Sequence, residues 1–185
     1  ELFTRKDEAE IAELRKAGRA IDAVHAQVPQ LLQAGRTEAE VAHELEKLIL
    51  QEHSVIDFVI VGSGPNGANP HHSFSDRVLA EGEPVVVDIG GTLPSGYHSD
   101  CTRTYVVGGD MSKAPQDFQD AYAVLADAQA AGRAAAHPGS TAADIDAIVR
   151  QAISAAGWGD YFVHRTGHGI GLSTHEEPFI MEGND

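Results

Sequence analysis

The stretch HRTGHGIGLSTHEEP, residues 164–178, decides how the rest of the sequence is interpreted. It places three histidines, His164, His168 and His175, within twelve positions, with glycines between them. Imidazole is a common metal ligand and proton carrier, and glycine lets a backbone approach a bound group closely. A lone histidine is usually a surface or core residue, but three in one motif favour a metal or catalytic site.

Two aspartates about eighty residues earlier extend this pattern. PVVVDI, residues 84–89, has the apolar, β-branched character of a buried strand that carries Asp88. Residues 97–107, YHSDCTRTYVV, are expected to be its hairpin partner and carry Asp100, in a setting where aspartate is disfavoured. A buried carboxylate is costly, so Asp88 is either a hydrogen-bonded turn residue or a ligand. Two carboxylates and an imidazole suit Mn²⁺, Co²⁺, Fe²⁺ or Zn²⁺.

Helical patterns surround these strands. Apolar residues at helical spacing predict one helix or a bent pair over 6–33 and another helix over 37–53, which a capping box of Thr37 and Glu40 opens. The further expectations are a strand over 56–61, a loop over 63–76, a turn over 90–96, helices over 115–136 and 141–157, and a strand from Tyr161 to Val163. If that last strand continues, His164 and His168 face the same way.

The two halves of the sequence echo each other. GRTEAEV at 35–41 matches GSTAADI at 139–145 at an offset of 104 residues. Each half runs helix, helix, strand and then reaches a loop that contains glycine and histidine. The pattern predicts an α+β fold made of a duplicated unit, with a site at the seam between the halves.

The composition excludes several classes of protein. The chain has 185 residues, 42% hydrophobic and 22% charged, which is typical of a globular domain. A formal charge of −15 argues against nucleic acid and anionic membranes as partners, because phosphates would be repelled. The sequence opens on a charged, helix-like segment, and Cys101 is its single cysteine, so we expect a reducing, cytoplasmic location.

The three motifs together resemble a known family. VVVDIGG, GYHSDCTRT and HRTGHGIGLSTHEEP, in this order, are similar to the pita-bread metallopeptidases, which include methionine aminopeptidase, aminopeptidase P and prolidase. The resemblance covers nearly the whole chain. The loop SGPNGANPHH, residues 63–72, is most similar to that of the Xaa-Pro peptidases.

This resemblance implies a centre of two divalent metal ions, with Mn²⁺ expected first. Asp88 corresponds to the carboxylate that chelates one metal ion, Asp100 to the bridging carboxylate and His168 to the histidine ligand. In such a centre the two ions lie about 3.5–4 Å apart and activate a water molecule as hydroxide.

The resemblance also implies roles for three further histidines. His175 corresponds to the histidine that contacts the scissile carbonyl, and His71 to the one that assists the leaving group or binds substrate. His164 occupies the position that approaches the substrate's proline in proline-directed members. The implied activity is metal-dependent hydrolysis of the Xaa-Pro bond at the N-terminus of dipeptides or short peptides.

The sequence departs from the family pattern at both ends. The family's other two metal ligands are glutamates on strands that follow the HEEP segment, and this sequence ends at Asp185; its proline-specific members also carry an additional N-terminal domain. We therefore expect residues 1–185 to be one catalytic domain, incomplete at its C-terminal side and without that N-terminal domain. An unpaired sheet edge would then make the chain unstable or pair it with a second copy.

Two alternatives stay open. One is a methionine aminopeptidase, which differs by substrate. The other is a non-catalytic domain of the same fold that binds peptides or partner proteins. The pair Asp88 and Asp100 counts against the second alternative, because an inactive site has no reason to retain costly carboxylates.

Overall fold

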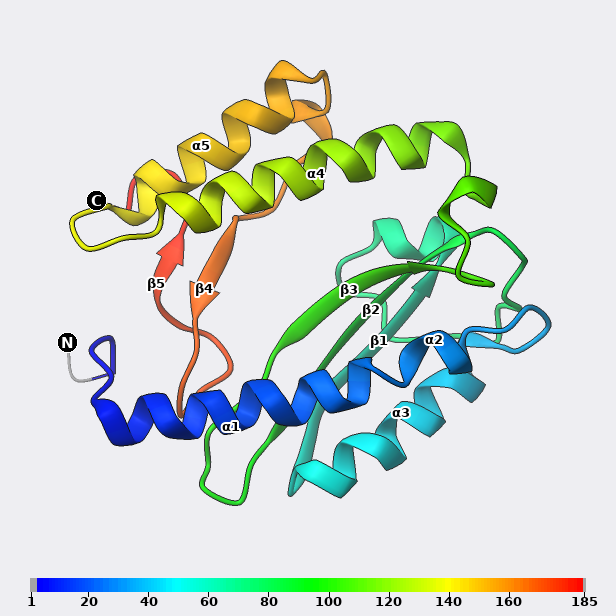
Figure 1. Ribbon diagram of the computed structural model, residues 1–185, viewed down its shortest axis with the longest axis horizontal. Helices are drawn as coiled ribbons and strands as arrows, with labels where there is room; N and C mark the ends of the chain where they lie inside the picture. Colours follow the sequence, from blue (N-terminus) through cyan, green and yellow to red (C-terminus); the bar gives the residue numbers. More distant parts are fainter. Residues whose placement is uncertain (1–2, 185) are drawn as a thin grey trace. The chain divides into compact units, whose positions relative to one another are not determined.

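The computed structural model describes residues 3–184, which form two compact units. The sheet unit comprises residues 5–115 and 170–174, and the helical unit comprises 116–169 and 175–184 together with 3–4. Both units combine helices with antiparallel strands, so the predicted α+β class is confirmed (Figure 1). No helix within residues 3–184 has the length and apolar character that crossing a bilayer requires.

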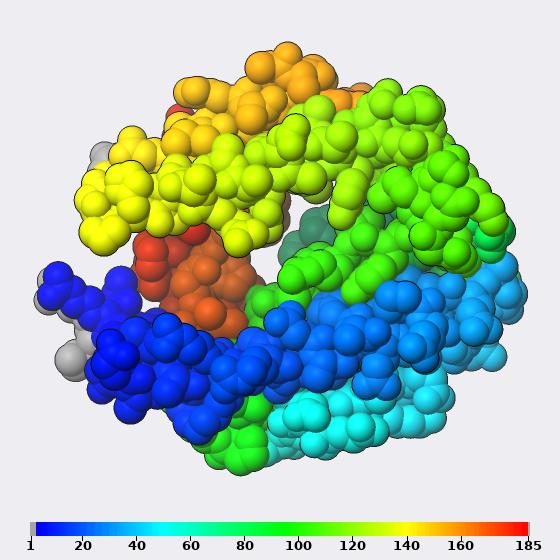
Figure 2. Space-filling model, in the orientation of Figure 1, coloured from blue at the N-terminus to red at the C-terminus, as the bar shows by residue number. Residues whose placement is uncertain are grey.

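Two long helices dominate the helical unit. Helices α4 (Gln116–Ala135) and α5 (Ala142–Ala155) pack against each other, and Figure 2 shows both at the visible surface of this unit. Their contact is close, because a Cβ atom placed on Gly132 would lie 2.5 Å from Cγ2 of Val149. The buried apolar side chains of this unit are Ala128, Val149 and Ile153.

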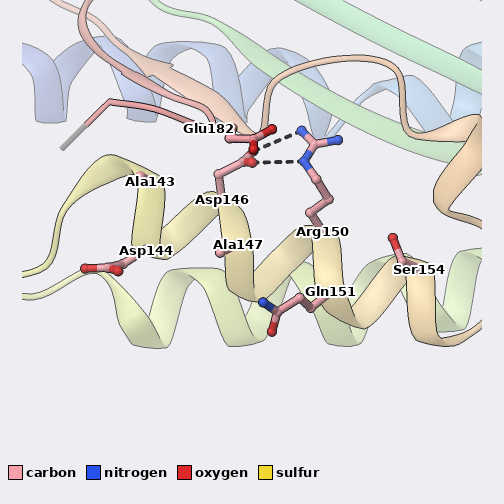
Figure 3. Close-up of a pocket in the computed structure, with 8 residues that line it drawn as sticks. All are labelled: Ala143, Asp144, Asp146, Ala147, Arg150, Gln151, Ser154 and Glu182. Carbon is pink, nitrogen blue, oxygen red and sulfur yellow. Dashed lines mark hydrogen bonds and ion pairs between the residues drawn. The ribbon is translucent and has the colours of Figure 1, made fainter.

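The segment that follows α5 is held by an ion pair on that helix. Asp146 is only 1% exposed and accepts hydrogen bonds from Arg150 at 2.9 and 3.1 Å and from Oγ1 of Thr166 at 2.6 Å. Arg150 also donates to the carbonyls of Phe162 and His164, each at 3.0 Å. Figure 3 shows the ion pair on the helix surface. Burial raises the pKa of Asp146, but the bonds from Arg150 and Thr166 outweigh it and lower that pKa.

These bonds explain why one predicted strand is wrong. The expected strand Tyr161–Val163 is absent: residues Gly159–Tyr161 form a 3₁₀ turn, and regular pairing begins only in β4 (Gly167–Gly169), which pairs antiparallel with β5 (Glu176–Ile180). Because Arg150 binds two carbonyls of the intervening segment, those groups satisfy their hydrogen-bonding capacity outside a sheet.

Three antiparallel strands form the sheet unit in the order β1–β2–β3. They are β1 (Val55–Ser63), β2 (Pro84–Thr92) and β3 (Cys101–Val106). The turn predicted over residues 90–96 begins too early, because β2 continues to Thr92. The reversal lies at Leu93–Tyr97, where the N–H of Leu93 donates to the carbonyl of Tyr97 at 2.8 Å.

Gly90 lets β2 extend past the predicted turn. A Cβ atom at this position would lie 2.4 Å from the carbonyl oxygen of Ser99 and 2.6 Å from Cε1 of Phe58. The backbone of Ser99 therefore approaches β2 more closely than any side chain at position 90 would permit. The N–H of Ser99 donates to the carbonyl of Gly91 at 2.9 Å, so backbone hydrogen bonding to β2 is already present before the first residue of β3.

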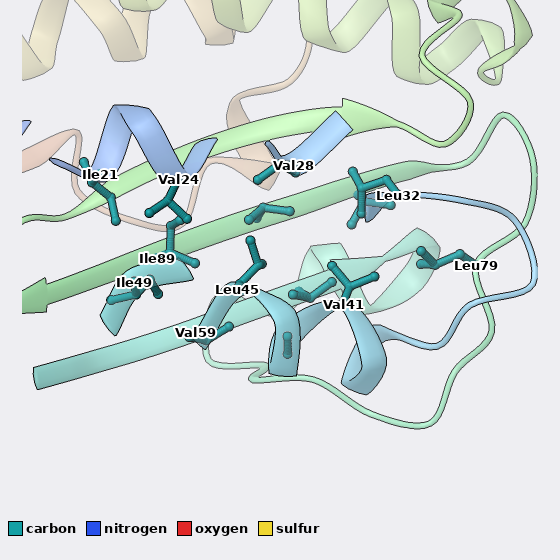
Figure 4. Packing of buried hydrophobic residues seen from close by; sticks show 14 of the residues in the cluster. Ile21, Val24, Val28, Leu32, Val41, Leu45, Ile49, Val59, Leu79 and Ile89 are labelled. Atoms are coloured by element: carbon teal, nitrogen blue, oxygen red, sulfur yellow. The ribbon is translucent and has the colours of Figure 1, made fainter. Parts of the chain in front are cut away.

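Helices cover one face of this sheet. The predicted segment 6–33 is the bent pair α1 (Glu8–His25) and α2 (Val28–Leu31), with Pro29 in the first turn of α2. Helix α3 (Glu38–Glu52) follows the predicted cap at Thr37. Figure 4 shows the apolar core between these helices and the strands. Its largest fully buried side chains include Leu32, Leu45, Ile49, Leu79 and Ile89.

Helices α3 and α5, one in each unit, begin in the same way. Thr37 accepts the N–H of Glu40 at 3.1 Å and donates its own N–H to that carboxylate at 2.8 Å. The matching bonds between Thr141 and Asp144 are 3.1 and 3.3 Å long. The box at Thr37 was predicted, and the two boxes lie at equivalent points of the internal repeat.

The close approach at Gly90 leads to the first prediction. Gly90→Ala should destabilise the protein by about 1–3 kcal/mol, because the new methyl group meets a backbone carbonyl that cannot move freely. Gly18→Ala is the matched control: this glycine lies within α1, nothing lies within 4 Å of its added Cβ, and alanine should stabilise the helix by about 1 kcal/mol. Urea unfolding measures both. Equal midpoints for the two variants would contradict the prediction.

The ion pair on α5 leads to the second prediction. Arg150→Ala should destabilise the helical unit by about 2 kcal/mol, because it leaves Asp146 buried without its cation and removes the bonds to two carbonyls. Hydrogen exchange should rise in residues 162–169. The control is Arg133→Ala, which removes an exposed arginine from α4. Equal stability of the two variants would show that the ion pair contributes nothing.

Candidate metal centre

Asp88 lies on the face of β2 opposite the helices. Val87 and Ile89, its neighbours in the strand, are fully buried in the core, so the alternation of the strand turns Asp88 to the other side. Asp88 pairs in register with Thr102 of β3, whose Oγ1 donates to Oδ1 of Asp88 at 2.7 Å. The valine-rich strand thus presents one carboxylate on a polar face, with a hydroxyl that orients it.

Asp100 lies two residues before Thr102, just ahead of β3. Its neighbour Ser99 is buried, and Oγ of Ser99 lies 2.9 Å from Nε2 of His53. Ser99 therefore faces the core, which turns Asp100 to the polar face that Asp88 and Thr102 share. Burial lowers the pKa of His53, so this internal hydrogen bond is made by a neutral imidazole.

His98 lies two residues before Asp100, and its ring already has a partner. Nδ1 of His98 lies 2.7 Å from Oδ2 of Asp57, and Oδ1 of Asp57 accepts a bond from Oγ1 of Thr92 at 2.7 Å. Oγ1 of Thr174 lies 3.2 Å from the same nitrogen, and the N–H of His98 donates to the carbonyl of Gly171 at 3.0 Å. His98 therefore fixes residues 170–174, the loop that precedes His175.

His168 and His175 lie together in the helical unit. His168 is the middle residue of β4, His175 directly precedes β5, and their ring centroids are 4.4 Å apart. Nδ1 of His168 lies 2.8 Å from the carbonyl oxygen of Gly169. Since a carbonyl only accepts, Nδ1 carries the proton and the lone pair of the neutral ring is on Nε2. This is the tautomer that a metal-binding histidine needs.

The other two predicted histidines are on irregular segments. His164 is exposed and lies three residues before β4, so strand alternation does not place it on the side of His168. Its carbonyl, however, is bound by Arg150. His71 is exposed on the loop after β1, and its N–H donates to Oδ1 of Asn69 at 3.0 Å. Its neighbour His72 turns inward and binds the buried Glu38 at 2.8 Å.

The side chains in each unit are of the kinds that bind divalent cations. The sheet unit offers two carboxylates on one face, and carboxylate oxygens suit the harder ions. The helical unit offers an imidazole in the correct tautomer, and imidazole nitrogen suits ions such as Zn²⁺ and Fe²⁺. Cys101 stands beside Asp100 in sequence, but burial raises the pKa of its thiol, which disfavours a thiolate ligand.

The residues that hold the segments of His71 and His164 in place were not predicted from the sequence. Glu38 and Asp146 are almost completely buried and bind the segments that carry His71 and His164. A signal for Asp146 was present, since it stands four residues before Arg150 on a predicted helix. Glu38 gave no such signal, because its partners come from a loop 25 or more residues away.

A pocket on α5 is distinct from the predicted site residues. It has a volume of about 420 Å³ and includes the ion pair of Asp146 and Arg150 (Figure 3). None of the six predicted site residues lines it. The residues that line it are Ala143, Asp144, Asp146, Ala147, Arg150, Gln151, Ser154 and Glu182.

Comparison with known proteins places this arrangement in a family. The chain is 57% identical over 181 residues to the probable dipeptidase PepE of Mycobacterium tuberculosis, covering 97% of this chain and 47% of that protein. It is 40% identical over 185 residues to the Xaa-Pro dipeptidase of Pyrococcus furiosus, covering 98% and 51%. The chain therefore spans about half the length of these relatives.

A solved structure supports the same assignment. The crystal structure of dipeptidase PepE from Mycobacterium ulcerans matches with a TM-score of 0.92 and 55% identity, covering 97% of this chain and 48% of that one. The pita-bread fold implied by the motifs is thereby confirmed. Metallopeptidase family M24 matches residues 12–185, and with these identities this match shows that the chain belongs to that family.

Proposed function

We propose that the protein hydrolyses the Xaa-Pro bond at the N-terminus of dipeptides or short peptides, with two divalent metal ions. The observation that carries the proposal is that two carboxylates, Asp88 and Asp100, belong to the polar face of the sheet, where Thr102 orients Asp88, in a chain of family M24. The name of the Pyrococcus furiosus relative, Xaa-Pro dipeptidase, supports the choice of substrate.

The ligands in this proposal are Asp88, Asp100 and His168. Thr102 holds the Asp88 carboxylate in place, and the bond from Nδ1 of His168 to the Gly169 carbonyl leaves the lone pair of the ring on Nε2, the atom that would bind a metal ion. Ions bound there would lower the pKa of a water molecule and polarise the scissile carbonyl. We expect Mn²⁺ first, because carboxylate ligands favour the harder ions, with Co²⁺, Zn²⁺ and Fe²⁺ as alternatives.

The remaining histidines act on the peptide. His175 donates a hydrogen bond to the carbonyl oxygen as negative charge develops on it. His71 gives a proton or a hydrogen bond to the departing nitrogen of proline. His164, whose backbone Arg150 fixes, faces the proline ring. Recognition of a short peptide also depends on the free amino group at its N-terminus.

The setting of the reaction follows from charge and cysteine content. A formal charge of −15 disfavours nucleic acid as a partner. Cys101 is the single cysteine of the chain, which is consistent with a reducing cytoplasm. We propose a second copy of the protein, in a homodimer, as its protein partner.

The experiment that tests the function is hydrolysis of Ala-Pro by the natural full-length protein. Activity should be lost with a chelator and return with Mn²⁺, and Ala-Ala should be a much poorer substrate. Asp100→Asn and His168→Gln should each lower kcat/KM by about 100-fold or more, because a lost ligand removes several kcal/mol of transition-state stabilisation. Metal content per chain, measured by mass spectrometry, should fall in both variants.

The matched control is His137→Gln, which changes an exposed histidine in the turn after α4 and should leave activity unchanged. Chelator-resistant hydrolysis, or full activity of Asp100→Asn, would refute the proposed centre. Preference for Met-Ala over Ala-Pro would identify a methionine aminopeptidase instead. Peptide binding without turnover would identify a binding domain.

A further inference from the structure

Glu38 is a completely buried carboxylate that the proposed reaction does not use. It is the first residue of α3, and its relative exposure is 0%. An ionised carboxylate in such a place is stable only if hydrogen bonds replace its water shell. The side chains and N–H groups that do this all come from one segment, the end of β1 and the loop that follows it.

The contacts saturate both carboxylate oxygens. Oε1 accepts the N–H and the Oγ–H of Ser63, both at 2.7 Å, and Nδ2 of Asn66 at 3.0 Å. Oε2 accepts a hydrogen bond from Oγ of Ser75 at 2.7 Å, and Nε2 of His72 lies 2.8 Å from it. Burial raises the pKa of Glu38, but the bonds from Ser63, Ser75 and His72 outweigh it and lower the pKa to about 2. The group is therefore ionised at neutral pH.

The loop that Glu38 binds has little structure of its own. Residues 64–76 contain one short 3₁₀ turn, at 64–68, and are rich in glycine, asparagine, proline and serine. Such a composition leaves many conformations open, so ordering this loop costs much conformational entropy. The first turn of α3 contributes two further bonds, from the N–H of Glu38 to the carbonyl of Arg77 and from Ala39 to Ser75, both at 3.0 Å.

His71 lies between the points at which this loop is held. Asn66 binds Glu38 before it, and His72 and Ser75 bind Glu38 after it. The His71 side chain is exposed, and its N–H donates to Oδ1 of Asn69 within the same loop. Its position in space therefore depends on the residues on either side of it, and these depend on Glu38.

We propose that Glu38 is a positioning residue, which fixes His71 for its action on the substrate by binding His72 and the rest of this loop. The two adjacent histidines then have different tasks: His72 anchors the loop inward, and His71 points outward to the peptide. This inference rests on the proposed peptidase function and adds to it a residue that never touches the substrate.

The test uses Glu38→Gln in the natural full-length protein, because the amide keeps the size of the side chain but replaces one acceptor oxygen by a donor. Hydrogen exchange in residues 64–76 should rise at least about tenfold, with the rest of the sheet unit unchanged. For Ala-Pro, kcat should fall about 10- to 100-fold while KM changes little. Glu52→Gln, at the exposed end of the same helix, is the matched control and should show neither effect.

A double-mutant cycle separates positioning from a general structural role. His71→Ala should lower kcat without raising exchange in the loop, and Glu38→Gln should cause no further loss of kcat in the His71→Ala background. Additive losses would overturn the proposal, since Glu38 would then act independently of His71. If Glu38→Gln fails to fold, His72→Gln replaces it, because this change removes a single contact at a partly exposed residue.

The same measurements distinguish a failure of this inference from a failure of the proposed peptidase function. Absence of Ala-Pro hydrolysis by the wild-type protein would refute the peptidase function and the catalytic part of this inference together. The exchange experiment would still decide whether Glu38 anchors the loop. Normal exchange in Glu38→Gln, combined with normal kcat, would refute the inference and leave the peptidase function intact.

Discussion

A carboxylate can stay buried only where hydrogen bonds replace its hydration, and this requirement shapes both units. In the sheet unit Glu38 meets it with side chains of the loop after β1, and in the helical unit Asp146 meets it with Arg150 and Thr166. Glu38 lies on α3 and Asp146 on α5, and each acid holds an irregular segment that follows a strand or a helix. Each of those segments carries a histidine of the predicted site.

These hydrogen bonds explain how a segment without regular secondary structure can hold a histidine in a fixed position. Residues 64–76 and 162–166 lack regular strand pairing, so their conformation is not set by a ladder of backbone bonds. Charged hydrogen bonds to a buried partner replace that ladder and are stronger than neutral ones. These two segments can therefore keep an irregular backbone, which exposes His71 and His164, while hydrogen bonds to neighbouring residues fix them.

The sheet has one face that packs into the apolar core and an opposite, polar face that carries Asp88. Val85, Val87 and Ile89 fill the space beneath α1 and α3, and the residue between the last two, Asp88, faces the other way. Gly90 then allows the chain of Ser99 to come close enough that Asp100 follows on the same face. The apolar packing that stabilises the unit is thus also what orients the two carboxylates.

Elements with a local cause could be predicted from the sequence. They are the capping box at Thr37, the helices that begin after Thr37 and Thr141, and the valine-rich strand at 84–89, each of which depends on neighbours a few residues away. The motifs also identified the family, and the pairing of His168 with His175 follows from a short hairpin. Tertiary contacts set the end of β2 and the beginning of β3, because both depend on the contact of Gly90 with Ser99. Tertiary contacts also set the conformation of residues 162–166 and the partners of Glu38, since side chains distant in sequence satisfy these polar groups, and no local pattern encodes them.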